Sequence, residues 1–322
     1  MNWVGSRVNA NTRRALKLVT LATAAVGMVG LAYLLTWNRP ATLAKLSGHA
    51  PGCPWSRVVR AYFDARGLKE RSTASTAEVS VEGRDQAFGL ELVKSPQRSF
   101  WIKQGTDQNW SGEHLLAFLL AEHAWMGDAN PNEAVRPADV VIDCGAHVGV
   151  FVQRALTRGA SKVVAVEPDP ANLECLRRNF REEIATGKVV LVPKGVWNSV
   201  TTLTFSESTQ NSGMNSFVMQ ERGTKMLLPV TTIDSIVEEL RLGRVDYIKM
   251  DIEGSEREAL KGARKTLARF RPRLMMDTYH RPDDPRVLPA LIEEANPSYR
   301  TTCGPCFEIE NGRLIPHVTY FY

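Results

Sequence analysis

The sequence predicts an α/β protein of Rossmann-like type: a mostly parallel seven-strand sheet with helices on both faces, preceded by a small β-rich cap and one N-terminal transmembrane helix. Three observations lead to this fold class. After Pro137, short apolar strands alternate with amphipathic helices, as in parallel sheets covered on both faces. A glycine-containing loop and an acidic residue follow the first two of these strands. The first 63 residues contain eight Lys or Arg and no acid, unlike the rest of the chain.

The N-terminal segment reads as a membrane anchor and stem over residues 1–63. Residues 18–38 are 21 positions without a formal charge, 15 of them apolar, which suits the roughly 30 Å hydrocarbon core of a bilayer. We therefore expect a helix at about 16–38 that makes the protein single-pass, with its side of the membrane undecided because basic residues flank both ends. A cleaved signal peptide and an organelle transit peptide are the alternatives.

Charge and cysteine content exclude several classes of protein. The formal charge of +5 belongs to the N-terminal segment, and its removal leaves 32 basic against 35 acidic residues, so a nucleic-acid partner is not expected. Five scattered cysteines argue against a disulfide framework. Cys303-Gly-Pro-Cys306 spells a redox motif, but only 16 residues follow it, so we favour a loop or strand-end role over redox chemistry.

Residues 64–138 predict the β-rich cap. Short apolar stretches such as 87–93 and 99–102 are broken by Gly83, Gly89 and Gly105, which is typical of β-hairpins, and 115–120 reads as a short helix.

The domain at 139–322 follows with alternating strands and helices. We expect strands at 140–142, 163–166, 189–192, 245–250, 274–276 and 317–322, and two more at 202–205 and 226–230 around an insertion rich in Ser, Asn and Gly. Helices are expected at 148–156, 173–184, 233–240, 255–267 and 287–292, the fourth opened by a capping box, Ser255 to Glu258.

Two strand ends point to a nucleoside ligand. The first strand leads into Asp143-Cys-Gly145-Ala-His-Val-Gly149, whose glycines permit a tight turn and close backbone approach. Glu167 follows the second strand, 24 residues after Asp143, where such folds place the acid that binds ribose hydroxyls. Asp143 would repel a dinucleotide's phosphates but favour an ammonium group, so S-adenosylmethionine suits this site. Loop glycines with two solvated acids are the structural alternative.

The chain resembles the FkbM-like family of S-adenosylmethionine-dependent methyltransferases from about residue 100 to 322. The resemblance rests on 141–149, on Val166-Glu-Pro-Asp-Pro170, on Ile248-Lys-Met-Asp-Ile-Glu-Gly-Ser-Glu256 with 260–262, and on Tyr279-His280. It implies a class I Rossmann-like methyltransferase that usually modifies a hydroxyl oxygen.

The expected cofactor residues follow from the loop, the acid and this resemblance. Related enzymes often use an acid after the third strand for the adenine, but this chain has Lys194 to Asn198 there, so backbone with Val196 and Trp197 is expected instead. The predicted cofactor-binding set is Asp143, Gly145, Ala146, Gly149, Glu167, Pro168 and Val196.

The expected catalytic residues follow the fourth and fifth strands. Asp251 and Glu253 are placed to orient or deprotonate an acceptor hydroxyl, and His280, with an ordinary pKa near 6.5, is the candidate base at neutral pH. The alternatives are that Glu253 bonds loop amides, that His280 is a structural loop histidine and that Lys249 only neutralises a nearby acid. No metal is expected, with magnesium at Asp251 and Asp277 as the alternative.

These observations favour a membrane-tethered O-methyltransferase that uses S-adenosylmethionine. Its acceptor would be a hydroxyl on a small molecule, a sugar or a lipid-linked compound, and neither the acceptor nor the oligomeric state can be read from the residues. A catalytically silent binding module with the same fold is the rival. An oxidoreductase is disfavoured by the loop pattern.

Overall fold

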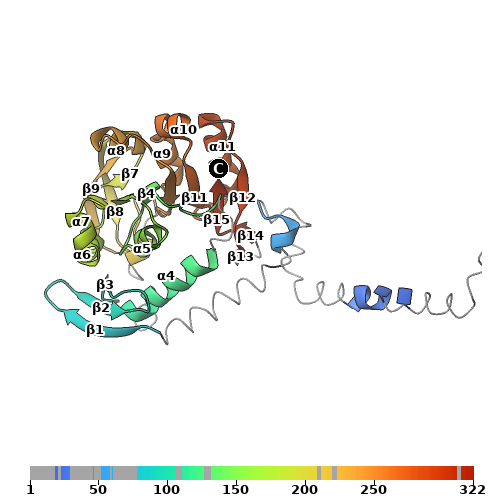
Figure 1. Ribbon diagram of the computed structural model, residues 1–322, viewed down its shortest axis with the longest axis horizontal. Helices are drawn as coiled ribbons and strands as arrows, with labels where there is room; N and C mark the ends of the chain where they lie inside the picture. Colours follow the sequence, from blue (N-terminus) through green and yellow to red (C-terminus); the bar gives the residue numbers. More distant parts are fainter. Residues whose placement is uncertain are drawn as a thin grey trace, which may run out of the picture.

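The centre of the molecule is a seven-strand sheet in the order β12-β15-β11-β10-β4-β5-β6 (Figure 1). A computed structural model describes residues 19–20, 23–29, 46, 52–58, 60, 78–105, 111–126, 132–208, 212–219, 223–309 and 313–322. Strands β4, β5, β6, β10 and β11 are parallel, whereas β15 runs antiparallel between β11 and β12. The mostly parallel seven-strand sheet is therefore confirmed. The strands are β4 Val140–Cys144, β5 Lys162–Val166, β6 Val189–Val192, β10 Tyr247–Met250, β11 Arg273–Asp277, β12 Thr301–Cys303 and β15 Val318–Phe321.

Alternate residues of the strands face two separate apolar cores, one on each side of the sheet. Val141 and Val163 belong to one core, whereas their neighbours Ile142 and Val164 belong to the other. This alternation is the period of two expected of a strand, and both faces are covered because both sets are apolar. Figure 1 shows α8 to α11 on one side of the sheet, and α4 with the cap on the other. The helices are α4 Gly112–Met126, α5 Val150–Thr157, α6 Pro170–Asn179, α7 Arg181–Ala185, α8 Ile233–Glu239, α9 Glu256–Lys261, α10 Arg264–Phe270 and α11 Asp284–Ala295.

Two predicted helices are each divided in the structure. The helix expected at 173–184 is broken at Phe180 into α6 and α7, and the helix expected after Ser255 is broken near Gly262 into α9 and α10. A Cβ at Gly262 would lie 2.3 Å from the Trp197 carbonyl oxygen, so close packing requires glycine there. The prediction of a capping box was wrong. The Ser255 side chain makes no cap hydrogen bond, and the Glu258 carboxylate accepts from Lys261 and Asn198 instead.

The cap is an antiparallel three-strand meander that shares the core on the α4 side of the sheet. Its strands are β1 Ser80–Asp85, β2 Leu90–Lys94 and β3 Phe100–Lys103. Asn179 joins the cap to the sheet domain: its side-chain amide donates to the carbonyls of Trp101 and Val148 and accepts from the Trp101 N–H. The division of the chain at residue 138 stays a prediction.

An insertion between β6 and β10 lies beside the sheet. It contains β7 Gly195–Val196, β8 Thr201–Ser206, the short 3-10 helix η2 Ser212–Met214 and β9 Lys225–Thr231, in the sheet order β7-β9-β8.

A C-terminal hairpin, β13 Cys306–Ile309 with β14 Arg313–Pro316, is joined by a disulfide to Cys53. The sequence argued against a disulfide framework, and the described residues contain this one pair, separated by 253 residues. Cys303 ends β12 and Cys306 begins β13, as expected for a strand-end role.

The predicted membrane localisation needs correction. Of the helix expected at 16–38, residues 19–20 and 23–29 are described and are helical, and the other positions lie outside the described residues. Within the described part of the chain, no helix combines the length and the apolar character needed to cross a membrane. This finding contradicts the predicted single-pass anchor.

Candidate functional site

A cavity of about 300 Å³ opens at the carboxyl ends of β4, β5, β10 and β11. The chain passes from β4 to β5 and β6 and then returns to place β10 on the other side of β4, so the cavity lies where strand order reverses. Its walls come from α4, the loop after β4, the insertion and the segments after β10 and β11. The predicted site residues that line it are Gly145, Ala146, Glu167, Pro168, Val196, Asp251 and Glu253.

The loop after β4 requires glycine at two positions. Gly145 has φ of +77°, and a Cβ there would lie 2.0 Å from the Asp251 carbonyl oxygen. Gly149 has φ of +95°, and a Cβ there would lie 2.1 Å from the Phe180 ring. Positive φ and this lack of space both exclude a side chain. Gly149, at the end of the loop, does not line the cavity.

Glu167 is a buried carboxylate that holds the loop and lines the cavity. One oxygen accepts from the His147 N–H at 2.8 Å, and the other accepts from the Asp169 N–H at 2.9 Å. Burial raises the pKa of Glu167 to about 7, with a further rise from Asp169, although these N–H donors oppose it. A carboxylate oxygen can accept more than one hydrogen bond, so Glu167 can also accept from a ligand hydroxyl.

Asn172 adds a polar group that the sequence analysis missed. It lies in the first turn of α6, its amide donates to Glu167 at 3.4 Å, and it lines the cavity. Its side-chain oxygen is buried and has no hydrogen-bond partner within the described structure. Buried polar atoms are normally satisfied, so this oxygen suits a donor from a ligand. The only sequence signal was its distance of five residues from Glu167.

Asp143 lies beneath the loop, outside the cavity lining. It is completely buried and lies 3.5 Å from Lys249 Nζ, which donates to the Gly145 carbonyl at 2.8 Å. Burial raises the pKa of Asp143 to about 6, and the neighbouring ammonium opposes the shift. For Lys249, burial lowers the pKa, but Asp143 and Asp251 outweigh it and the net shift is upward. Lys249 thus neutralises Asp143 and supports the loop, as one of the sequence alternatives held.

The insertion forms a wall opposite the glycine loop. His147 Nε2 lies 2.8 Å from the Ser212 hydroxyl, and the Asn215 amide donates to Asp169 at 2.6 Å. Burial, helped by Lys249, lowers the pKa of His147 to about 4, so this imidazole is neutral at pH 7. His147 therefore forms part of the cavity wall. Val196 lines the same region, whereas Trp197 does not.

The segment after β10 presents two carboxylates to the cavity. Glu253 has φ of +51°, a left-handed conformation held by the Ser216 hydroxyl, which donates to the Glu253 carbonyl at 2.7 Å. Asp251 keeps 33% of its side chain exposed, against 16% for Glu253, although its Oδ1 is buried and has no hydrogen-bond partner in the described structure. Asp251 is therefore the more accessible carboxylate of the pair.

His280 lies behind these carboxylates, outside the cavity lining. Its Nε2 lies 3.3 Å from Glu253 and 3.8 Å from Asp251, and its Nδ1 lies 3.0 Å from Glu256. Burial lowers the pKa of His280, but Glu256 and Glu253 outweigh it and leave the pKa well above 6.5. The ordinary pKa expected from the sequence is thus not found, because Glu256 was not recognised as a partner.

The end of β11 and the segment after it complete this side of the cavity. Asp277 and Tyr279 line it, and burial, reinforced by negative neighbours, raises the pKa of both groups. Asp251, Glu253 and His280 each offer a metal-ligand atom, all within 4.8 Å of one another. Both His280 nitrogens, however, face carboxylates.

Comparison with known proteins agrees with this geometry. Residues 143–299 match the family model described as "Methyltransferase FkbM domain". The hexuronic acid methyltransferase AglP of Haloferax volcanii is 26% identical over 235 residues, which cover 73% of this chain and 87% of AglP.

Two solved structures illustrate the range of similarity. Methyltransferase FkbM from Methylobacillus flagellatus is 22% identical with a TM-score of 0.44, and the match covers 68% of this chain and 56% of that one. This chain thus spans just over half the length of that protein. Precorrin-6y C5,15-methyltransferase from Geobacter metallireducens is 12% identical with a TM-score of 0.35, covering 59% and 81%. Over residues 143–299, the chain is thus similar to FkbM methyltransferase domains.

Proposed function

We propose that this protein transfers a methyl group from S-adenosylmethionine to a hydroxyl of a sugar-type acceptor. The observation that supports this most directly is that one cavity is lined on one side by Gly145 and Glu167 and on the other by Asp251 and Glu253. A donor and an acceptor can therefore meet within the same cavity, where their reacting atoms are held close.

The residues on the β4 and β5 side suit a nucleoside without phosphate. Glu167 and the unpartnered Asn172 oxygen can accept hydrogen bonds from the two ribose hydroxyls. Pro168 and Val196 supply apolar surface for the adenine. Asp143 supports this side from below through Lys249 and the Gly145 carbonyl, instead of contacting the ammonium as first expected.

The residues on the β10 and β11 side suit activation of a hydroxyl. When bound, S-adenosylmethionine supplies an electrophilic methyl group on a cationic sulfur. Asp251 is the accessible carboxylate that can orient the acceptor hydroxyl and take its proton. Glu253 is held by His280 and by the Ser216 hydroxyl, which bonds its carbonyl, and His280 acts as a positioning residue between Glu253 and Glu256.

The acceptor class is inferred from AglP and from the cavity wall. AglP is described as a hexuronic acid methyltransferase, which makes a sugar hydroxyl the first acceptor to test. The α4 wall includes Leu115, Phe118 and Leu119, whose apolar side chains can pack against the C–H face of a sugar ring. Small-molecule and lipid-linked acceptors carrying such a sugar share this chemistry.

Cofactor binding and methyl transfer provide two separate tests. S-adenosylmethionine at 100 times its Kd should stabilise the protein by about 2.7 kcal/mol, measured by thermal unfolding. The labelled methyl group should then appear on a hexuronoside, with its position read by NMR, and the matched hexoside tests whether the carboxylate is needed. Stabilisation without transfer to any glycoside would contradict the sugar acceptor. No stabilisation at all would favour the catalytically silent binding module.

A further inference from the structure

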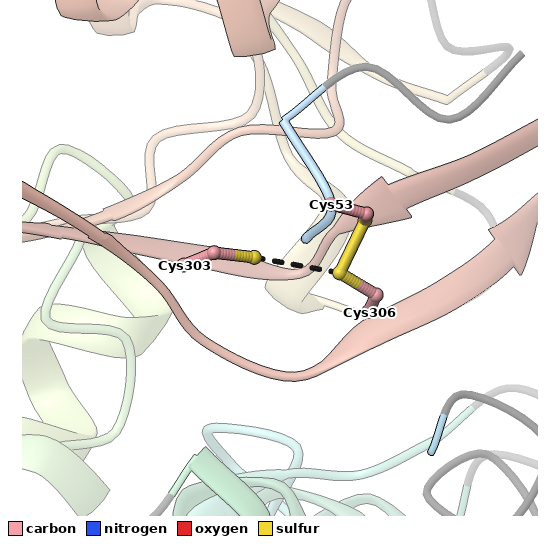
Figure 2. Close-up of side chains that lie close together, drawn as sticks. All are labelled: Cys53, Cys303 and Cys306. Atoms are coloured by element: carbon pink, nitrogen blue, oxygen red, sulfur yellow. Dashed lines mark hydrogen bonds between the residues drawn. A yellow bond between two sulfur atoms is a disulfide. The ribbon is translucent and has the colours of Figure 1, made fainter. Parts of the chain in front are cut away.

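Three cysteine sulfurs meet beside the C-terminal hairpin, one from segment 52–58 and two from the Cys303-Gly-Pro-Cys306 turn (Figure 2). Cys53 and Cys306 form the disulfide, and Cys303 Sγ lies 3.4 Å from Cys306 Sγ. All three sulfurs lie within 4.8 Å of one another. The Cys303 thiol donates to the Gly304 carbonyl at 3.2 Å and is not in a disulfide.

We propose that Cys303 and the Cys53–Cys306 disulfide form a thiol–disulfide exchange site. The Cys303 thiolate attacks Cys306 Sγ, the nearest disulfide sulfur, and the Cys303–Cys306 bond forms as the Cys53–Cys306 bond breaks. The electron pair leaves on Cys53 Sγ, which takes up the proton that Cys303 released. One disulfide and one thiol are present before and after, so the step needs no external oxidant or reductant.

The surroundings keep the three sulfurs together during the exchange. Cys53 and Val58 are buried with Cys306 and Leu314, and Cys303 packs against this cluster. Gly52 is exposed, but one side of it lies against the hairpin, since a Cβ there would lie 3.2 Å from Pro316 and 3.4 Å from Pro285. Segment 52–58 is thus seated on the hairpin by apolar contacts as well as by the disulfide, so the exchange can run in both directions.

The exchange site is connected to the cavity through aromatic rings. Phe307 follows Cys306 directly and packs edge-on against Tyr279, with ring centroids 5.4 Å apart. Tyr279 lines the cavity and stacks on His317, which Phe307 also contacts. When the disulfide partner of Cys306 changes from Cys53 to Cys303, the packing of Phe307 against Tyr279 therefore changes, and with it the acceptor side of the cavity. This consequence rests on the proposed function, whereas the exchange itself does not.

The exchange can be measured by mapping disulfides in the full-length protein. Trypsin without reduction yields peptides 46–57, which contains Cys53, and 301–313, which contains Cys303 and Cys306. The Cys53–Cys306 isomer joins the two peptides, whereas the exchanged isomer leaves 301–313 closed on itself. Native protein is labelled with N-ethylmaleimide at pH 8 over a range of concentrations. At low concentrations, where exchange precedes alkylation, we expect at least about one tenth of the label on Cys53. Label on Cys303 alone at every concentration would overturn the proposal.

Three variants sharpen this measurement. Cys303→Ser should give only the linked peptides and no label on Cys53, whereas Cys53→Ser should give only the closed 301–313 peptide. Cys175→Ala is the matched control: this buried thiol, whose pKa burial raises to about 12, lies outside the cluster, so the wild-type pattern should persist. Label on Cys53 in Cys303→Ser, or three reduced cysteines holding zinc in native mass spectrometry, would refute the exchange.

The effect on the cavity is tested separately. Cys53→Ser and Cys303→Ser fix the two isomers, and we expect their methyl-transfer rates to differ by about fivefold, with S-adenosylmethionine affinity unchanged. Equal rates, with both isomers verified by mapping, would remove the link to the cavity.

Discussion

Lys249 Nζ lies 3.5 Å from Asp143 Oδ1, and both side chains are buried beneath the glycine loop. Lys249 comes from β10 and Asp143 from the neighbouring β4, where the two residues are register partners. The same ammonium donates to the Gly145 carbonyl, so the pair connects two strands with the loop that lines the cavity. A buried charge pair is costly to break, because one charge is then left without compensation.

Lys249→Met should therefore destabilise the protein, by about 3 to 5 kcal/mol at neutral pH. The pKa of folded Asp143 is already about 6, above its ordinary 3.8, and loss of Lys249 raises it further. The folded state then holds the proton more tightly than the unfolded state, so stability falls as pH rises from about 4. Urea unfolding at pH 5 and pH 8 should show the larger loss at pH 8. Adding Asp143→Asn should remove this pH dependence, and a loss that is equal at both pH values would contradict the account.

Glu167 predicts a pH dependence of cofactor affinity. Its pKa of about 7 means that below pH 7 the carboxyl is increasingly protonated, and a neutral acid accepts ribose hydrogen bonds less well. We expect Kd for S-adenosylmethionine to rise as pH falls from 8 to 5.5, measured by calorimetry. Glu167→Gln should bind at least about tenfold more weakly at pH 8 and show a flatter profile. An unchanged profile would remove Glu167 from the cofactor site.

The stability of the unliganded protein gives a second reading of Glu167. The pKa of Glu167 in the folded protein lies above the ordinary 4.5. Protonated Glu167 therefore contributes to the free energy of unfolding at low pH, and this contribution is lost as pH rises through 7. Glu167→Gln should therefore raise Tm relative to wild type more at pH 8 than at pH 5.

Gly145→Ala should abolish cofactor binding. The new Cβ would lie 2.0 Å from the Asp251 carbonyl oxygen, so the loop and the segment after β10 cannot both keep their positions. Gly187→Ala is the control, because Gly187 also has positive φ, +71°, but nothing lies within 4 Å of a Cβ there. It should cost only about 1 to 2 kcal/mol of stability and leave Kd unchanged. Equal effects in the two variants would show that backbone strain, and not close packing, is what matters at Gly145.

The strands and the loop could be predicted because their signals are local. The strand predicted at 189–192 has the same bounds as β6. Gly145 and Glu167 were identified because each comes shortly after a predicted strand. The partners of charged groups could not be predicted, because they depend on side-chain packing. His280 was expected to have an ordinary pKa, yet Glu256 approaches it from the start of α9.

The breaks in the two long helices show the same limit. Periodic apolar residues continue through Phe180 and Gly262, so the pattern alone favours continuous helices. The contact between Gly262 and the Trp197 carbonyl is tertiary and leaves no trace in the periodicity. The disulfide between Cys53 and Cys306 was hidden for the same reason, since 253 residues separate the two cysteines.

Asp251→Asn should reduce methyl transfer about 10²- to 10⁴-fold while leaving S-adenosylmethionine affinity within a few fold, because the acceptor side of the cavity loses its accessible carboxylate. Glu294→Gln is the matched control, an exposed acid on α11 paired with Arg264. Glu253→Gln should also reduce the rate.

His280→Gln tests the positioning role of the imidazole. Without the positive charge at His280, the pKa of Glu253, which burial already raises, rises further, because His280 is the main group opposing that shift. The acidic limb of the rate profile should move to higher pH, an effect that loss of packing alone does not produce. A chelator should leave every rate unchanged. If a chelator abolishes activity and magnesium restores it, the reaction instead depends on a metal held by carboxylates such as Asp251 and Asp277. If Asp251→Asn and Glu253→Gln both keep full activity, neither residue takes part in the chemistry.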